Sequence, residues 1–361
     1  KDSRTASNAA GVEAGDDKTP EHAVVDADGY RQEALRLGQE LWDSAIRDHK
    51  GRPEWLGMDL GADGESFHFG LIGNALYSGG SGIALLLARL AQGQAGDSAD
   101  RWRRRAWSCF AELAELAERN SNDQFFRLEG GGWPTGAAAS QGKPALTGFS
   151  HGAAGMASAL ARLAQVSGEA RFAEGAHRAV GYERSVFDHK RGNWPDFRSS
   201  SEPSEFMLSW CHGAPGILLS RAVLAEAGVA DEHSAAEQHS AQASTLAAVE
   251  TLLNPAGDPP AHLCCGVLGL TSVLRVNAHA RGQEVAGPVA AAESAVMRRA
   301  QARGGYSFFA VDTSSLNLPG LYTGKAGIAL ALLEAADGLQ WLPAVLSAGL
   351  LNISESQAGP D

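Results

Sequence analysis

Apolar residues recur at helical spacing after a glycine turn at five places along the chain. In the first copy, Ile83, Leu86 and Leu90 fall on one face of a helix, and that face should contact a core. Each apolar run follows a Gly-x-x-Gly, where the missing Cβ atoms allow a sharp turn into the helix or the close approach of another backbone. The copies are "YSGGSGIALLLARLA" (77–91), "SHGAAGMASALARLA" (150–164), "CHGAPGILLSRAVLA" (211–225), "CCGVLGLTSVLRVNA" (264–278) and "YTGKAGIALALLEAA" (322–336).

The segments between these copies carry further helical patterns that are more polar. Examples are "WSCFAELAELAER" and "ARFAEGAHRAVGYERSVF". The alternation typical of strands is scarce. The first glycines of successive copies lie 53 to 73 residues apart, a spacing that suits two helices and their loops per unit. We therefore expect an all-α fold, an (α/α) toroid or barrel of helical hairpins, in which the inner helices begin at the five glycine turns.

The remaining composition sets the expected domain limits and excludes some functions. Residues 1–28 are polar and aperiodic and predict a disordered or linker arm, so that the toroid domain would cover 29–361. A formal net charge of -12 disfavours a nucleic-acid surface, which needs Lys and Arg to neutralise phosphates. Neither a run of about 18 apolar residues nor a signal-peptide pattern occurs, so we expect a cytoplasmic protein without a membrane span.

Three of the four cysteines occupy the same local position, the start of a Gly-x-x-Gly turn. They are Cys211, Cys264 and Cys265, and in a closed ring of hairpins these turns would converge. Three thiolates can hold Zn2+ and leave one tetrahedral position open, and soft sulfur ligands favour zinc over magnesium or calcium. The alternative is that free cysteines are buried as small hydrophobic residues. Cys109, inside the helical "WSCFAEL", fits that alternative and is not expected to be a ligand.

Two histidines stand beside the same turns. A zinc ion with three thiolates would leave a fourth, incoming thiolate nucleophilic, which suits the activation of a substrate thiol. His151 occupies the position of the cysteines in the second copy, and we expect it to transfer protons, because an imidazole titrates near neutral pH. His212 directly follows Cys211, and a catalytic role, a role in supporting the ligands and a role as ligand all stay open.

Several of these motifs together resemble the lanthionine synthetase C-like cyclase family. They are "ALTGFSHGAAGMA", "YERSVFDHKRGNWPDF", "SWCHGAPGI", "HLCCG" and "PGLYTGKAGIALALL", and the resemblance runs from about Trp55 to about residue 345. The nearest match is the C-terminal cyclase region of the class II bifunctional lanthionine synthetases. The resemblance implies an (α/α) toroid with one zinc ion per chain. It also implies the addition of a peptide cysteine thiol to dehydroalanine or dehydrobutyrine, which forms the thioether rings of lanthipeptides such as lantibiotics.

The resemblance also implies roles for individual residues. Cys211 and Cys264 match the family's two cysteine ligands, and Cys265 stands where many members have histidine, as in the three-cysteine subgroup. His151 matches the histidine proposed as the acid/base, and His212 takes a position near the substrate that is often tyrosine or histidine. The implied partners are a dehydrated precursor peptide with its leader and a dehydratase domain or partner enzyme. The implied location is the cytoplasm, with association to a membrane-bound export and modification complex.

The chain departs from the family pattern in two respects. Members normally have seven helical hairpins, whereas five repeat turns occur here, and residues 120–130 mark a deletion or a discontinuity of the chain. The aspartate that ordinarily partners the catalytic histidine belongs to a unit without a counterpart here. The second departure is that no dehydratase region precedes the match, so we expect the chain alone to cyclise but not to dehydrate a peptide.

Two other functions fit the same pattern of residues. The first is the addition of a free thiol such as glutathione to dehydro residues. The second is a non-catalytic toroid that binds a peptide or a partner enzyme, with a structural zinc ion. A glycosidase on an (α/α) toroid would require a carboxylate pair, and the glycine turns carry thiols and imidazoles instead.

Overall fold

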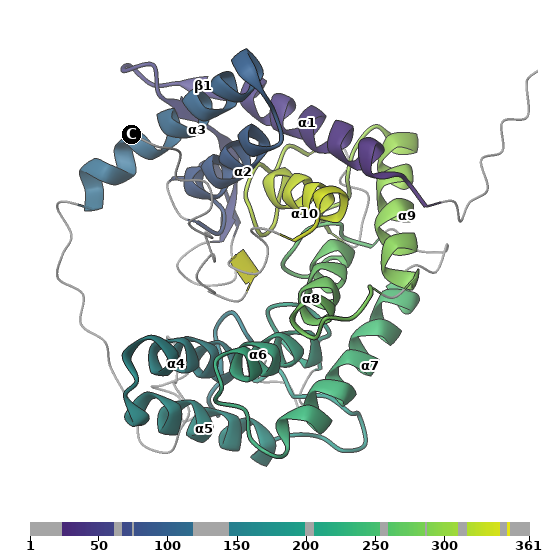
Figure 1. Ribbon diagram of the computed structural model, residues 1–361. Helices are drawn as coiled ribbons and strands as arrows, with labels where there is room; N and C mark the ends of the chain where they lie inside the picture. The colour runs from purple at the N-terminus through teal and green to yellow at the C-terminus, as the bar shows by residue number, and fades with distance from the viewer. Residues whose placement is uncertain are drawn as a thin grey trace, which may run out of the picture.

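Helices dominate the described part of the protein. The computed structural model describes residues 24–60, 67–73, 76–117, 144–198, 206–252, 259–285, 287–309, 316–339 and 345–346, and within them it has ten α-helices and four short strands. The predicted all-α class is confirmed. In Figure 1 the helices form two concentric rows around a centre, as an (α/α) toroid requires.

The inner row consists of the five helices that follow the glycine turns. The residue that caps each of them is the first glycine of the predicted Gly-x-x-Gly. The inner helices are α2 (Gly80–Gln92), α4 (Ala153–Ser167), α6 (Ala214–Glu226), α8 (Val267–Ala280) and α10 (Lys325–Asp337). The outer helices are α1 (Ala27–Asp43), α3 (Gly96–Ala117), α5 (Ala170–Ser185), α7 (Ser234–Leu252) and α9 (Gly287–Arg303).

Each inner helix pairs with the outer helix of its own hairpin, and α8 packs against α7 as well. Four inner helices pair with the outer helix that follows them in the chain, namely α2 with α3, α4 with α5, α6 with α7 and α8 with α9. The fifth, α10, pairs with α1, so the first helix of the described chain completes the last hairpin. The purple α1 accordingly lies beside the yellow α10 in Figure 1. Inner helices contact one another in the order α4, α6, α8, α10 and α2, with α2 and α4 at the two ends of this arc.

The second glycine of every turn makes a close backbone contact. A Cβ atom at Gly269 would lie 1.8 Å from the carbonyl oxygen of Leu263, and one at Gly327 would lie 1.7 Å from that of Leu321. In all five copies the clashing carbonyl belongs to the residue six positions earlier, so the loop folds back over the first turn of its own helix. The second glycines are Gly82, Gly155, Gly216, Gly269 and Gly327. Close approach of backbone is therefore the physical reason for a glycine at this position.

Buried ion pairs join neighbouring hairpins. Arg221 on α6 is fully buried and donates hydrogen bonds to Glu183 on α5 (2.9 Å) and to Glu237 on α7 (2.6 Å). Arg89 on α2 donates to Glu334 on α10 (2.7 Å) and to Asp337 (3.1 Å). Arg221 thus joins α6 to two neighbouring helices, whereas both carboxylates that Arg89 contacts lie on α10, so Arg89 joins α2 to α10 alone.

Two small antiparallel hairpins of strands lie between α1 and α2 in the chain. The strand β1 (Ile46–Arg47) pairs with β2 (Pro53–Glu54), and β3 (Leu56–Leu60) pairs with β4 (Phe67–Leu71) in a register that sets Met58 opposite Phe69. Their small share of the chain agrees with the scarcity of strand patterns in the sequence.

The N-terminal boundary differs slightly from the expectation of an arm over 1–28. Helix α1 begins at Ala27, because the Asp26 side chain accepts a hydrogen bond from the N–H of Gly29 (2.7 Å) and caps the first turn. Residues 1–23 of the expected arm lie outside the described residues, as do residues 120–130, where a deletion or discontinuity is expected. Within the described ranges, no helix combines the length and the apolar character that crossing a membrane requires.

Candidate metal centre

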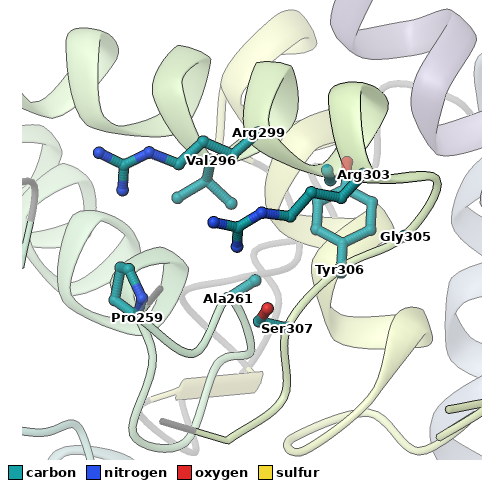
Figure 2. A pocket seen from close by; sticks show the side chains of 9 residues that line it. Pro259, Ala261, Val296, Arg299, Arg303, Gly305, Tyr306 and Ser307 are labelled. Atoms are coloured by element: carbon teal, nitrogen blue, oxygen red, sulfur yellow. The ribbon is translucent and has the colours of Figure 1, made fainter. Parts of the chain in front are cut away.

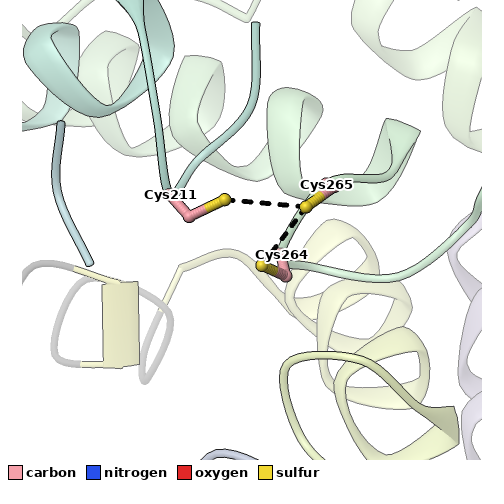
Figure 3. Close-up of side chains that lie close together, drawn as sticks. All are labelled: Cys211, Cys264 and Cys265. Carbon is pink, nitrogen blue, oxygen red and sulfur yellow. Dashed lines mark hydrogen bonds between the residues drawn. The ribbon is translucent and has the colours of Figure 1, made fainter. Parts of the chain in front are cut away.

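The three cysteines of the glycine turns meet in space. Cys211 precedes α6, and Cys264 and Cys265 precede α8. The Sγ atoms of Cys211 and Cys265 lie 3.6 Å apart, those of Cys265 and Cys264 lie 3.4 Å apart, and all three lie within 4.8 Å of one another. Figure 3 shows the three side chains directed toward a common point. The cluster could therefore hold a metal ion.

These distances fit a metal ion better than a disulfide. Zinc–sulfur bonds of about 2.3 Å at a tetrahedral ion place neighbouring sulfurs about 3.8 Å apart. A disulfide would require about 2.05 Å between its sulfurs, and all four cysteines are free. Adjacent residues of a helix or strand would direct Cys264 and Cys265 apart, and the glycine turn before α8 removes that restriction.

The charge balance of the three thiols also fits a cation. Hydrogen bonds from Cys264 and Cys265 lower the pKa of Cys211 to about 2. The pKa of Cys264 rises well above its ordinary value, and that of Cys265 rises to about 12, because hydrogen bonding to the Cys211 sulfur favours their protonated forms. A second negative charge beside the first is unfavourable in this buried setting. A doubly charged cation would remove that repulsion and make three thiolates compatible.

Backbone hydrogen bonds between turns set the positions of the sulfurs. The N–H of Phe149, before α4, donates to the carbonyl oxygen of Cys211 (3.0 Å). The N–H of Cys264 donates to the carbonyl oxygen of Tyr322, before α10 (2.8 Å), and the N–H of Tyr322 donates to that of Tyr77, before α2 (3.0 Å). The turns that start neighbouring inner helices are thus fastened to one another by the main chain.

Ser209 supports the turn that carries Cys211. Its Oγ lies 3.2 Å from the Cys211 sulfur and accepts a hydrogen bond from the N–H of His212 (3.2 Å), while its own N–H donates to the carbonyl oxygen of His212 (3.0 Å). Gly213 follows with a φ of 82°, and a Cβ there would lie 1.9 Å from the carbonyl oxygen of Met207. A side chain is excluded at this position on both grounds.

His262 supports the other turn, and the sequence analysis did not single it out. Its Nδ1 accepts a hydrogen bond from the N–H of Cys265 (3.3 Å), which fixes the second of the paired cysteines. Burial lowers the pKa of His262 to about 4, so its imidazole is neutral at pH 7 and can accept this bond. The signal in the sequence was its position two residues before the cysteine pair in "HLCCG".

His212 is buried next to a carboxylate that the sequence analysis also missed. It is 1% exposed, neither ring nitrogen has a hydrogen-bond partner within the described part of the chain, and its Nδ1 lies 3.8 Å from Oδ1 of Asp196. Burial alone would raise the pKa of Asp196, but hydrogen bonds from Arg198, with 2.7 Å between Nη2 and Oδ2, keep that pKa below its ordinary value. Asp196 lies in the "NWPDF" segment, whose sequence gives no indication that it folds against His212.

His151 stands at the surface beside His212. It is exposed and precedes α4, and the centroids of the two imidazole rings are 6.3 Å apart. The two histidines named from sequence are thus neighbours, one buried and one open to solvent. Because His212 directly follows Cys211, both lie beside the turn of the cysteine cluster.

Aromatic rings pack behind the cluster. Trp210 is stacked on Tyr322, with ring centroids 4.6 Å apart, and it tilts against Phe149 at 5.9 Å. These three rings are buried and belong to the turns before α6, α10 and α4. They form a rigid apolar support for the loops that carry the sulfurs.

Two cavities of the described chain are lined by residues other than the three clustered cysteines. Figure 2 shows a pocket beside α9, lined by Arg299, Arg303 and Tyr306, whose volume of about 10 Å³ accommodates about one water. A larger cavity of about 240 Å³ lies beside Trp55 and the fourth cysteine, Cys109. Burial raises the pKa of Cys109 to about 12, so its thiol stays protonated and unreactive, as expected for a packing residue.

Comparison with known families identifies the chain. The family model described as "Lanthionine synthetase C-like protein" matches residues 135–346, more than half of the 361 residues. The chain belongs to the lanthionine synthetase C-like family. This match covers the three clustered cysteines and both histidines, which lie between 151 and 265.

One solved structure of related description is similar to this lanthionine synthetase C-like chain. It is a nisin cyclase, with 18% sequence identity, a TM-score of 0.45, and an alignment that covers 76% of this chain and 68% of that one. No curated protein sequence matches the chain. In this chain a cluster of two buried and one half-buried cysteine lies beside the buried imidazole of His212 and the exposed imidazole of His151, at the turns that start the inner helices.

Proposed function

We propose that this chain is a zinc-dependent lanthionine cyclase. It would join a cysteine thiol of a dehydrated precursor peptide to a dehydroalanine or dehydrobutyrine of the same peptide and so form a thioether ring. The observation that carries the proposal is the convergence of the Cys211, Cys264 and Cys265 sulfurs, in a chain of the lanthionine synthetase C-like family.

The three sulfurs would hold the zinc ion as thiolates. When bound, zinc lowers the pKa of a coordinating thiol and so supplies a nucleophilic thiolate at neutral pH. Three protein ligands leave one tetrahedral position for a substrate group, as in catalytic rather than structural sites. The open position distinguishes a cyclase from a toroid in which zinc only holds the fold.

Residues of the chain would then donate the proton and stabilise the negative charge that the addition requires. The substrate sulfur forms a bond to the β-carbon of the dehydro residue, and the electron pair of the C=C bond moves to the carbonyl oxygen as an enolate. The α-carbon must then gain a proton. The substrate thiol releases its proton to solvent when it ionises, and His151, exposed beside the centre, would deliver the proton to the α-carbon, because an imidazole can donate and accept protons.

His212 and the Asp196–Arg198 pair would position the substrate. Among the described residues neither nitrogen of the buried His212 ring has a hydrogen-bond partner, so both would be available to a polar group of the peptide that reaches the ring. Arg198 is held by Asp196 and lies within electrostatic range of Cys211 and Cys265, where its charge favours anionic species. Arg198 can therefore stabilise charge that develops near the sulfurs.

The partners follow from this chemistry. The substrate would be a dehydrated precursor peptide with its leader, and a dehydratase domain or partner enzyme must first remove water from its Ser and Thr residues. We place the reaction in the cytoplasm, with association to a membrane-bound export and modification complex as part of the proposal.

A thiol-protection assay on a dehydrated peptide tests the function. Ring formation leaves the peptide mass unchanged, so free thiols are alkylated with N-ethylmaleimide after incubation and counted by mass spectrometry. The zinc-loaded chain should protect the thiols faster than buffer with zinc alone, and Cys211→Ala should abolish the difference. Equal rates with and without the chain would refute the proposal. Glutathione offered in the same tube would give a mass increase if free thiols are the preferred substrates.

A further inference from the structure

The position two residues before the first glycine of each turn is equivalent in all five copies. In two copies it holds a cysteine of the cluster, and in two it holds a tyrosine. In chain order the five residues are Tyr77, Ser150, Cys211, Cys264 and Tyr322. The repeat that brings Cys211 and Cys264 together therefore directs Tyr77 and Tyr322 to the same central region.

The main chain and the aromatic rings hold Tyr77 next to the turn of Cys264. The rings of Tyr77 and Tyr322 are stacked, with centroids 5.0 Å apart and an angle of 9° between their planes. Two backbone hydrogen bonds join the three residues, from the N–H of Tyr322 to Tyr77 (3.0 Å) and from the N–H of Cys264 to Tyr322 (2.8 Å). In this arrangement the phenol of Tyr77 lies within interaction range of the Cys264 side chain, and this contact adds to the burial that raises the pKa of Tyr77.

Tyr322 belongs to the same stack of rings, but its hydroxyl group has a different partner. Its hydroxyl donates to the carbonyl oxygen of Val345 (2.5 Å), and its side chain is 6% exposed. Tyr77 is 38% exposed, so this residue, unlike Tyr322, is partly open to solvent. The two tyrosines thus occupy equivalent positions of the repeat with different partners for their hydroxyl groups.

We propose that Tyr77 is a positioning residue of the metal centre, whose phenol orients the Cys264 sulfur and shares its negative charge. The inference rests on the proposed function. A hydrogen bond to a thiolate withdraws electron density from the sulfur and fixes its direction, and partners of this kind tune metal affinity. Tyr77 lies outside the residues matched by the family model, 135–346, so that match says nothing about it.

Cobalt binding to matched variants tests this role without the cyclisation assay. Apoprotein is titrated with Co2+, and the sulfur-to-cobalt charge-transfer absorption gives both affinity and band position. Tyr77→Phe keeps the stacked ring and removes only the hydroxyl, and we expect it to lower the affinity about tenfold or more and to shift the band. Tyr322→Phe removes the hydroxyl of the other stacked ring and should leave both readings unchanged. The unfolding midpoint of each apoprotein shows whether the fold is retained.

Three results would overturn the inference, and they are distinguishable. A Tyr77→Phe variant with the affinity and spectrum of the unmodified chain would remove Tyr77 from the centre and leave the cyclase proposal intact. Equal effects of Tyr77→Phe and Tyr322→Phe would assign the effect to the stack rather than to the contact with sulfur. A lack of charge-transfer absorption in the unmodified chain would refute both the role of Tyr77 and the metal centre.

Discussion

The backbone N–H of Cys264 donates a hydrogen bond to the carbonyl oxygen of Tyr322, with 2.8 Å between nitrogen and oxygen. The bond joins the turn before α8 to the turn before α10 and involves no sulfur atom. Together with the bond from Phe149 to Cys211, it anchors each cysteine-bearing turn to the turn of another inner helix through the main chain. The thiols can therefore be changed without removing the contacts that place them.

Cys265→Ala should separate metal binding from folding. We expect its helical circular dichroism to equal that of the unmodified chain, because the backbone bonds between turns remain. Its zinc affinity should fall by more than about 100-fold, because the loss of a ligand costs more than the loss of a residue that only hydrogen-bonds to a ligand. Zinc is measured by competition with a chromophoric chelator. Cys109→Ala is the control and should keep its zinc, so equal losses in both variants would contradict a three-cysteine site.

Gly269→Ala should destabilise the fold strongly. The added Cβ would lie 1.8 Å from the carbonyl oxygen of Leu263, a backbone atom that cannot move without the turn of the cysteine pair. We expect the free energy of unfolding in urea to fall by about 3 kcal/mol or more. Gly181→Ala, in the interior of α5, meets no atom within 4 Å and should raise that energy by about 0.5–1 kcal/mol. A mild effect at Gly269 would contradict the close approach.

Arg221→Met should be among the most destabilising changes away from the centre. Its removal leaves Glu183 and Glu237 without their shared cation, and Glu183 is fully buried. The expected loss in the free energy of unfolding is about 3–5 kcal/mol. Arg103→Met, which breaks the exposed pair with Asp100, should cost less than about 1 kcal/mol. Similar losses in the two variants would argue against a structural role for the buried network.

Asp231→Asn should alter the dependence of stability on pH. Hydrogen bonds from Arg184 on α5 hold the pKa of Asp231 well below its ordinary value. A carboxyl with a lowered folded pKa contributes stability that is complete above its unfolded pKa, about 3.9, and is lost as the pH falls toward the folded value. The unmodified chain should lose more unfolding free energy than the variant from about pH 5 downward. Parallel curves for the two proteins between pH 3 and 7 would refute this.

The glycine turns made the architecture predictable from sequence. The first glycines, such as Gly79 and Gly266, cap the inner helices in all five copies, and apolar periodicity identified the helices behind them. The recurrence of cysteine at one position of the repeat then indicated that Cys211 and Cys264 would meet, because equivalent positions of a ring converge. Local pattern and repeat symmetry were sufficient for these features.

Contacts that break the repeat were not predictable in this way. Asp196 and His212 lie in different segments, and only the fold of the loop before α6 brings the carboxylate within 3.8 Å of the imidazole. His262 acts through one hydrogen bond to the N–H of Cys265, which depends on the shape of the turn. The role of Tyr77 was equally hidden, since tyrosine at the start of a glycine turn carries no metal-binding signal by itself.

Because α1 pairs with α10, its packing depends on a helix that is synthesised much later. A ribosome releases α1 long before α10 exists, so the face of α1 that packs against α10 has no partner helix during most of synthesis. Until then the nascent chain exposes an apolar helix face of the kind that chaperones bind and that promotes aggregation. This exposure ends when α10 has been synthesised and packs against α1.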